Sequence, residues 1–439
     1  MDRIKGHKFI MIILLFGFIA ALSYAFYFHM KPSADAKAYD SIAWSIVQGT
    51  GYTETTNPLP DSAIGRLGPG YEFFLAAIYW IFGHRLWVVW IIQSILHTAS
   101  AFIVYRLIRR LYVGDNGEKY AAIGAGFYIF FIDLLEFPAM LLTETLYLFL
   151  VLSGIYFALL MWERPAMRNV LTTSVLFTSA LLVRPPVTIL MLVAIGFLMY
   201  RRLWRYAAIF AITAVIILTP WTVRNYLVYQ RFIVTSAILG YNVWVGNSPG
   251  SKYIGELTAT EEINRYTTEE GLFAVNKRGT REVLNLALRH PWEFIKLQLT
   301  KTSIYFSAAR PAAFWFHLSG ASQFLTIIFS SSFAFIIFAF GLSGLWLYIK
   351  KRDLISRMMV LATLAAPAGI IWIAAETRYR YQIYPMMIIL GIIFLAEFIK
   401  LPKRYAKILS VVTLIIASNT VFDVVRNIPR LTERLQRLF

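Results

Sequence analysis

Acidic and basic side chains lie at the ends of long apolar segments, where ionised groups are costly and therefore rare. Asp35 follows the first apolar run, and Glu144 opens the run LLTETLYLFLVL. Arginines occupy comparable places, at Arg66, Arg184, Arg224, Arg378 and Arg380. A carboxylate can take a proton from a hydroxyl, and a guanidinium binds phosphate through two parallel hydrogen bonds. These residues predict a site at one membrane face where a lipid-borne anion reacts with an outside acceptor.

Each of these residues also has a structural interpretation. Asp35 lies near the start of an expected helix, where a carboxylate stabilises the positive end of the helix dipole. Asp40 is expected to be a solvated helix residue. The arginines could anchor anionic headgroups or backbone carbonyls at the membrane interface. Glu144 is the hardest to explain by structure alone, because a continuous apolar run follows it.

The composition predicts an all-α polytopic membrane protein. Apolar residues make up 58% of the 439 residues and charged residues only 15%, whereas soluble domains carry roughly 25% charged residues. A soluble surface could not be covered with so few charges, so the apolar excess must face lipid. The net charge of +18 is explained by basic loops on one membrane face, so no nucleic-acid partner is expected.

About 11 membrane spans of roughly 20 residues each account for the apolar content. A signal peptide is the alternative for the first run, but that run is long and lacks an A-x-A cleavage site. Basic residues after several spans place those ends on the same side as the N-terminus, in the cytoplasm. The expected spans are 9–28, 87–105, 120–135, 141–161, 169–183, 186–200, 206–222, 324–348, 357–375, 384–399 and 407–424.

Two long segments then lie outside, 30–86 and 223–322. The first is expected to hold two interfacial helices, over 34–48 with Ser33 as its N-cap and over 70–82. The second is expected to form a small cap, with strands in RFIVTSAI and NVWVG and helices near 258–307 broken by Gly271, Gly279 and Pro291. The chain thus divides into an N-terminal transmembrane module (1–222), the cap (223–322) and a C-terminal transmembrane module (323–439).

No metal site or cofactor is expected from the spacing of potential ligands. The chain has no cysteine, which excludes disulfides and thiolate sites. Its six histidines, at 7, 29, 84, 97, 290 and 317, show no metal-binding spacing. A divalent metal held by carboxylates is not excluded by these observations.

The order of several motifs resembles the GT-C membrane glycosyltransferases. The segments are DAKAYDSIAWSIVQGTGY, GRLGPGYEFFLAAIYWIFG, LLTETLYLFLVL, PWTVRNYLVYQRFIVTSAILGYNVWVGNSPG and ETRYRYQIYP. The most similar groups are the protein O-mannosyltransferases, the aminoarabinose transferase of lipid A and the bacterial relatives of both. The resemblance extends from about residue 9 to residue 400 and rests on the ordered set of motifs.

The resemblance implies roles for individual residues. An acidic residue in the first outer loop with an aromatic residue four positions later matches Asp35 and Tyr39, and a second acidic position matches Glu144. The family's basic residue before a proline, which is associated with the carrier phosphate, is matched by Arg66. Relatives often carry Lys-Pro-Pro there, whereas this chain has Arg-Leu-Gly-Pro. Some relatives carry Asp-Glu where this chain has Asp35-Ala36, which argues against a metal held by adjacent acids.

The expected function is therefore inverting transfer of a sugar from a polyprenyl-phosphate donor to an acceptor on the extracytoplasmic face. The expected partners are that donor, membrane lipids and a glycan, lipid or protein acceptor. The expected location is a bacterial inner membrane. The alternative is a transporter or flippase of lipid-linked sugars, but such proteins often contain inverted repeats, and no repeat of 20–50 residues is evident. Neither the sugar nor the acceptor follows from the sequence.

Overall fold

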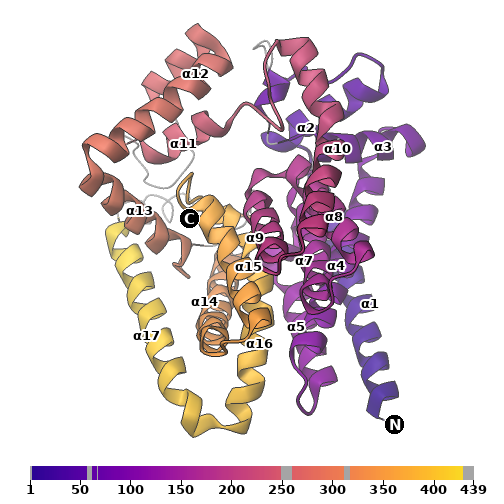
Figure 1. Cartoon of the computed structure of the whole chain (residues 1–439), viewed down its shortest axis with the longest axis vertical. Coiled ribbons are helices and arrows are strands. Elements are labelled where there is room, and N and C mark those ends of the chain that lie inside the picture. The colour runs from indigo at the N-terminus through magenta and orange to yellow at the C-terminus, as the bar shows by residue number, and fades with distance from the viewer. Residues whose placement is uncertain (1, 57–61, 67, 249–259, 311–316, 429–439) are drawn as a thin grey trace.

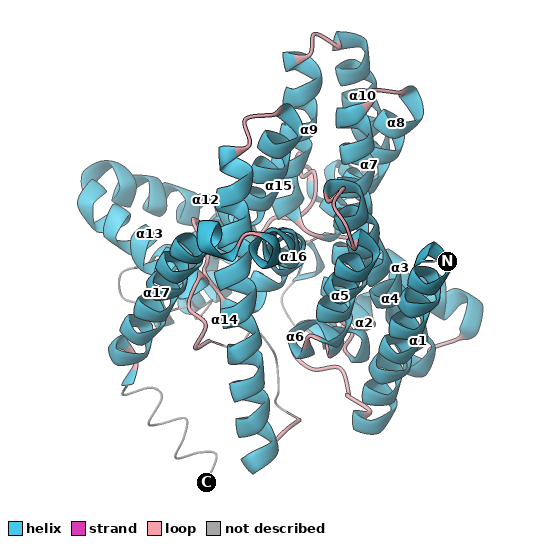
Figure 2. Ribbon diagram, turned by 90° about the horizontal axis from the view of Figure 1, so that it is seen from below, coloured by secondary structure: helices cyan, strands magenta, loops and turns pink. Residues whose placement is uncertain are grey.

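A computed structural model describes residues 2–56, 62–66, 68–248, 260–310 and 317–428. Helices are the regular secondary structure of these segments, and no strand occurs in them (Figures 1 and 2). The N-terminal module contains α1 (Asp2–Phe28), α2 (Asp35–Val47), α3 (Gly70–Phe82), α4 (Leu86–Leu111), α5 (Gly117–Phe130), α6 (Ile132–Leu135), α7 (Glu144–Glu163), α8 (Met167–Val183), α9 (Thr188–Tyr200) and α10 (Trp204–Tyr229). The rest contains α11 (Leu239–Asn247), α12 (Glu261–Arg289), α13 (Pro291–Tyr305), α14 (Gly320–Lys350), α15 (Leu354–Ile370), α16 (Tyr384–Lys400) and α17 (Pro402–Arg426).

Within the described residues, six helices are long and apolar enough to cross a membrane, namely α1, α4, α7, α10, α14 and α17. A seventh crossing is possible if α5 and the segment 132–139, which meet at 62°, form one broken span. The multi-pass architecture is thus confirmed, but the count of about 11 spans is not. Several expected spans are short: the 17 residues of α8 and of α15 rise only about 26 Å, less than a bilayer core of ~30 Å.

Helices occur at both positions where interfacial helices of the first outer segment were expected, as α2 and α3, which pack against each other at one end of the bundle (Figure 1). The expected cap by Ser33 is wrong. Ala34 holds the N-cap position with φ +47°, and no side chain caps the helix. Ser33 contributes its carbonyl oxygen instead, which accepts a hydrogen bond from the Ala36 amide at 3.0 Å.

Where the structure describes it, the segment expected to form a cap consists of helices and loops, so the two expected strands are wrong. The NVWVG segment lies within α11, and 231–238 is a loop. Close packing explains this outcome: a Cβ on Gly240 would lie 1.9 Å from the Asn276 carbonyl of α12. Gly271 kinks α12 with φ +80°, as expected, and α13 starts at Pro291. Gly279 does not interrupt the helix.

A buried lysine joins α13 to the chain just before the segment that carries Arg378. Nζ of Lys301 donates hydrogen bonds to Oδ1 of Asn247 at 2.8 Å and to the Trp372 carbonyl at 3.1 Å. Burial lowers the pKa of Lys301 to about 7. The helices of the outer segment are thereby fixed to the turn at 372–373.

Helices α14 and α16 approach so closely that one glycine has no room for a side chain. A Cβ on Gly344 would lie 2.2 Å from the carbonyl oxygen of Leu390 on α16. Small residues allow such backbone contact between membrane helices. The 3-10 helix η4 (Thr377–Gln382) leads directly into α16, so this packing also fixes the base of the segment that bears Arg378.

We expect Gly344→Ala to destabilise the protein by about 1–3 kcal/mol, the usual cost of overpacking. Gly196→Ala in α9 is the matched control, because nothing lies within 4 Å of a Cβ at that position. Unfolding of both variants in mixed micelles measures the difference. Equal stability of the two variants would contradict the close α14–α16 contact.

Candidate functional site

Five of the candidate residues lie at or next to the ends of helices, and these ends meet at one end of the bundle. Asp35 is the first residue of α2, and Glu144 is the first residue of α7. Arg184 follows α8 directly, and Arg378 lies in η4. Arg66 follows the short 3-10 helix η1 (Ser62–Gly65). Carboxylates at helix N-termini are stabilised by the helix dipole, so local structure favours both acidic positions.

These side chains form an unbroken chain of alternating charge. Arg66 pairs with Asp35 (Nη1–Oδ1 3.5 Å), and Asp35 pairs in turn with Arg378 (Oδ2–Nη2 3.4 Å). Arg378 also contacts Glu144 (Nε–Oε1 3.5 Å), and Glu144 pairs with Arg184 (Oε1–Nη2 2.9 Å). The two acids predicted from the sequence are thus joined through one arginine, although they lie more than 100 residues apart in the chain.

One member of this chain of charges, Glu54, was not anticipated. Its carboxylate accepts a hydrogen bond from Nε of Arg66 at 3.0 Å and a second from Nη2. Burial lowers the pKa of Arg66, but the bonds to Glu54 and the charge of Asp35 outweigh that effect, and the pKa is raised. Arg66 therefore stays fully charged and is held facing Asp35. No local sequence signal distinguishes Glu54 from other acids of a polar segment.

The members of the chain of charges differ in exposure. The side chain of Asp35 is 38% exposed, whereas that of Glu144 is completely buried and that of Arg184 almost so. Arg184 additionally donates to the hydroxyl of Thr143 and lies over the rings of Tyr379 and Tyr381. Solvent and solutes therefore reach Asp35, while the Glu144–Arg184 pair supports Arg378 from behind.

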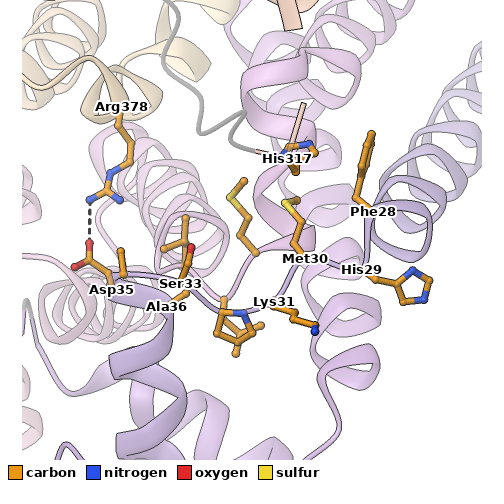
Figure 3. A pocket seen from close by; sticks show the side chains of 14 residues that line it. Phe28, His29, Met30, Lys31, Ser33, Asp35, Ala36, His317 and Arg378 are labelled. Carbon is orange, nitrogen blue, oxygen red and sulfur yellow. Dashed lines mark hydrogen bonds and ion pairs between the residues drawn. The ribbon is translucent and has the colours of Figure 1, made fainter. Parts of the chain in front are cut away.

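A cavity of about 440 Å³ opens beside Asp35 and Arg378. Figure 3 shows these two side chains at one end, joined by their ion pair, with Phe28, Met30 and His317 toward the other. The walls are mostly apolar and include Met140, Leu141 and Leu142. Glu144 is not among the lining residues, because it lies behind Arg378. The cavity thus combines a charged end with an apolar body.

Two further side chains of α2 and α3, Tyr39 and Glu72, are buried. Tyr39, one helical turn after Asp35, is buried and meets the ring of Tyr71 at 5.5 Å between ring centroids. Glu72 on α3 is completely buried. Burial raises the pKa of Glu72 to about 8, so this carboxyl is mostly neutral at pH 7. The chain of charges itself contains three carboxyl groups, those of Asp35, Glu54 and Glu144, and three arginines.

Two other predicted residues lie elsewhere. Arg224 packs over the rings of Tyr52, Trp221 and Tyr229. Arg380 is buried, donates to the Ser307 carbonyl and lies over Phe338. Neither forms an ion pair with the chain of charges, so their donor-binding role stays a prediction.

Asp40 was expected to be a solvated residue, and this is wrong. Its Oδ1 accepts hydrogen bonds from the Tyr79 hydroxyl at 2.6 Å and interacts with Nε2 of His84 at 2.8 Å. Asp40 therefore links α2 to α3 and to the residues that follow α3. It takes no part in the ion pairs of Asp35 with Arg66 and Arg378 and plays a structural part in the same helix.

The described residues contain no group of three His, Asp or Glu side chains placed to hold a metal ion. The acids of the chain of charges are instead each paired with arginine. The site can accordingly bind an anion between Arg66 and Arg378 and offers a solvent-accessible carboxylate between them.

Comparison with known proteins adds a family match for part of the chain. Residues 66–223 match the model of a family described as dolichyl-phosphate-mannose-protein mannosyltransferase. This match confirms the resemblance to GT-C membrane glycosyltransferases over a segment that includes Arg66, Glu144 and Arg184. Among solved structures, the crystal structure of ArnT from Cupriavidus metallidurans bound to undecaprenyl phosphate aligns with 13% identity and a TM-score of 0.38, covering 88% of this chain and 77% of that chain. No curated protein sequence matches the chain.

Proposed function

We propose that the protein transfers a sugar from a polyprenyl-phosphate donor to a hydroxyl acceptor, with inversion, on the extracytoplasmic face of a bacterial inner membrane. The observation that carries the proposal is the placement of Asp35 between Arg66 and Arg378 at the charged end of an apolar cavity. The family matched by residues 66–223 is described by a donor of this class, dolichyl-phosphate mannose. The sugar and the acceptor are left open.

Donor binding begins with an exchange of anions. In the structure, Asp35 occupies the guanidinium edges of both Arg66 and Arg378. A phosphodiester carries one negative charge and can accept hydrogen bonds from both arginines. When the phosphodiester takes the place of the Asp35 carboxylate on these two arginines, Asp35 is released from its two ion pairs. The apolar walls formed by Met140, Leu141 and Leu142 suit the first part of the polyprenyl chain.

The chemical step then uses Asp35 as a general base. An acceptor hydroxyl attacks the anomeric carbon, Asp35 takes its proton, and the bond between that carbon and the phosphate oxygen breaks. The polyprenyl phosphate leaves with the bonding electrons and an additional negative charge. Arg66 and Arg378 stabilise that charge, so the leaving group needs no general acid. A single attack of this kind inverts the anomeric configuration, and no covalent sugar–enzyme intermediate forms.

The proposal is tested by incubating purified protein in lipid with labelled polyprenyl-phosphate sugars and mixed acceptors. We expect release of polyprenyl phosphate together with labelled, inverted product. Movement of the labelled lipid across the bilayer without transfer would support a flippase instead. The glycan missing from a deletion strain would identify the acceptor.

We expect Arg378→Lys to weaken donor binding by about 10- to 150-fold. Lysine cannot make the two parallel bonds of a guanidinium, and one hydrogen bond to a charged group contributes about 1.5–3 kcal/mol. Binding of a polyprenyl-phosphate sugar to protein in nanodiscs measures the change. Arg106→Lys is the control, because Arg106 is exposed and contacts Tyr156 far from the site. Unchanged affinity in Arg378→Lys and in Arg66→Ala would refute phosphate binding by these arginines.

A further inference from the structure

An exposed apolar stripe runs along the junction of α12 and α13, which we call the elbow (residues 281–299). Its side chains are Leu284, Leu288, Trp292, Ile295 and Leu299. Leu284 and Leu288 are four residues apart on α12, and Trp292, Ile295 and Leu299 are three or four residues apart on α13, so each group lies on one face of its own helix. The two groups lie on either side of the junction at His290. Leu288 is 79% exposed and Trp292 is 74% exposed. Such exposure is costly in water, since none of these side chains is covered by the described chain.

The elbow adjoins a surface that faces lipid. The Ser303 hydroxyl, one turn beyond the stripe, donates a hydrogen bond to Oδ1 of Asn419 on α17 at 2.7 Å, and Nδ2 of Asn419 donates to the Ser303 carbonyl at 3.0 Å. Beside that contact, Val421, Phe422 and Val425 are exposed on the last turns of α17, one of the six membrane-crossing candidates. The apolar surface of α17 therefore continues onto the elbow.

The position of the elbow in the molecule agrees with its closeness to the exposed apolar surface of α17. Figure 1 shows the α12–α13 junction beside the upper end of α17, on the opposite side of the bundle from α3. Helix α3 also exposes large apolar side chains, Trp80 and Ile81 among them. Two amphipathic elements thus flank the bundle at the end where Asp35 lies.

We propose that the elbow inserts its apolar stripe into the outer leaflet of the bilayer, as an interfacial arm of the segment expected to be a solvent-exposed cap. Leucine and tryptophan on one face with arginine and lysine beside them are typical of helices that lie in a membrane interface. The basic neighbours are Arg281, Arg289 and Lys296, and the acidic ones are Glu282 and Glu293. The near balance of charge means that apolar contact, more than attraction to anionic lipid, holds the elbow in place.

Insertion also has a consequence for the site. Lys301 lies just beyond the stripe on α13 and bonds the Trp372 carbonyl, a few residues before Arg378. The bilayer therefore supports, through α13, the segment that presents Arg378. This support fixes the position of the segment that carries Arg378, whether or not the proposed reaction occurs.

The test uses site-directed spin labelling, for which the cysteine-free chain needs no background substitutions. The full-length variants Leu288→Cys and Leu299→Cys carry the label, in vesicles of phosphatidylethanolamine and phosphatidylglycerol. Leu414→Cys on the exposed apolar face of α17 is the lipid control, and Lys277→Cys, exposed on the polar part of α12, is the water control. Collision of each label with oxygen, which concentrates in lipid, is compared with collision with a water-soluble nickel complex.

We expect both elbow labels to resemble Leu414→Cys, with a ratio of oxygen to nickel collisions several-fold above that of Lys277→Cys. Labels that resemble Lys277→Cys would place the elbow in water and overturn the proposal. Labels shielded from both reagents would overturn it as well, because a second copy or another protein would then cover the stripe. The readout needs no enzymatic activity, so it stays valid even if the proposed sugar transfer is wrong.

Discussion

Asp35→Asn is expected to slow sugar transfer by about 10²- to 10⁴-fold, the usual effect of losing a general base. Asparagine keeps the shape of the side chain and can still accept a hydrogen bond, but it cannot take the proton of the acceptor. Asp35 is 38% exposed between two arginines, so acceptor and carboxylate can meet without a change of fold. Single-turnover transfer with a fixed donor concentration measures the effect.

Asp40→Asn is the matched control for this substitution. Asp40 lies in the same helix, but its carboxylate is bonded to Tyr79 and His84. Weakening one such hydrogen bond changes the free energy by about 1 kcal/mol, so we expect less than about a tenfold change in transfer. If Asp35→Asn retained near-normal turnover while Asp40→Asn lost it, the base would be Asp40.

Donor affinity gives Asp35→Asn a second, independent readout. Asp35 competes with the donor phosphate for Arg66 and Arg378 in the proposed exchange of anions. Removing its charge should therefore leave donor binding unchanged or tighten it while transfer falls. A variant that lost donor binding in parallel with transfer would indicate a disrupted site instead of a missing base.

Local pattern was sufficient to predict the helices that position Asp35. The helix expected over 34–48 is α2, and that expected over 70–82 is α3, because the periodicity of apolar side chains over one element reflects the face that it buries. The strands expected in 231–246 failed for the converse reason. Valine and tryptophan at 243–245 favour a strand locally, but close contact with α12 at Gly240 and with the chain at Ile373 beside Gly246 selects a helix.

The residues of the candidate site, too, could be predicted only in part from the sequence. The cost of an ionised group in an apolar setting singled out Asp35, Glu144 and Arg184 without any knowledge of contacts, and the structure joins Glu144 to Arg184 at 2.9 Å. Glu54 was missed because it lies in a polar segment where an acid is unremarkable, and its importance comes from a partner 12 residues away. Arg378 and Arg380 could not be told apart, since a 3-10 helix turns one toward Asp35 and the other toward Ser307.

Glu144→Leu is expected to destabilise the protein by about 3–5 kcal/mol, the cost of leaving a buried charge without its partner. Leucine has a similar size, so packing changes little and the effect is electrostatic. Arg184 is nearly inaccessible and forms its ion pair with Glu144, whereas Arg378 still has Asp35. Unfolding in mixed micelles with increasing detergent denaturant measures the loss.

The double variant Glu144→Leu/Arg184→Met separates charge from packing. Removing both partners of a buried pair is often nearly neutral, so we expect the double variant to be more stable than Glu144→Leu alone. Additive losses from the two single substitutions would show that the pair does not interact, and the buried end of the chain of charges would then have no structural role.

Glu144→Gln tests the part that Glu144 plays in transfer. Glutamine still accepts a hydrogen bond from Arg184 through its side-chain oxygen, so the protein should fold, but Arg378 loses the carboxylate behind it. Arg378 then keeps its ion pair with Asp35 and its place over the ring of Tyr379 but loses the ionic contact with Glu144, so it presents its guanidinium to phosphate less accurately. We expect transfer to slow less than in Asp35→Asn, with weaker donor binding contributing to the loss. A loss of transfer equal to that of Asp35→Asn, with donor binding unchanged, would instead make Glu144 a participant in proton transfer.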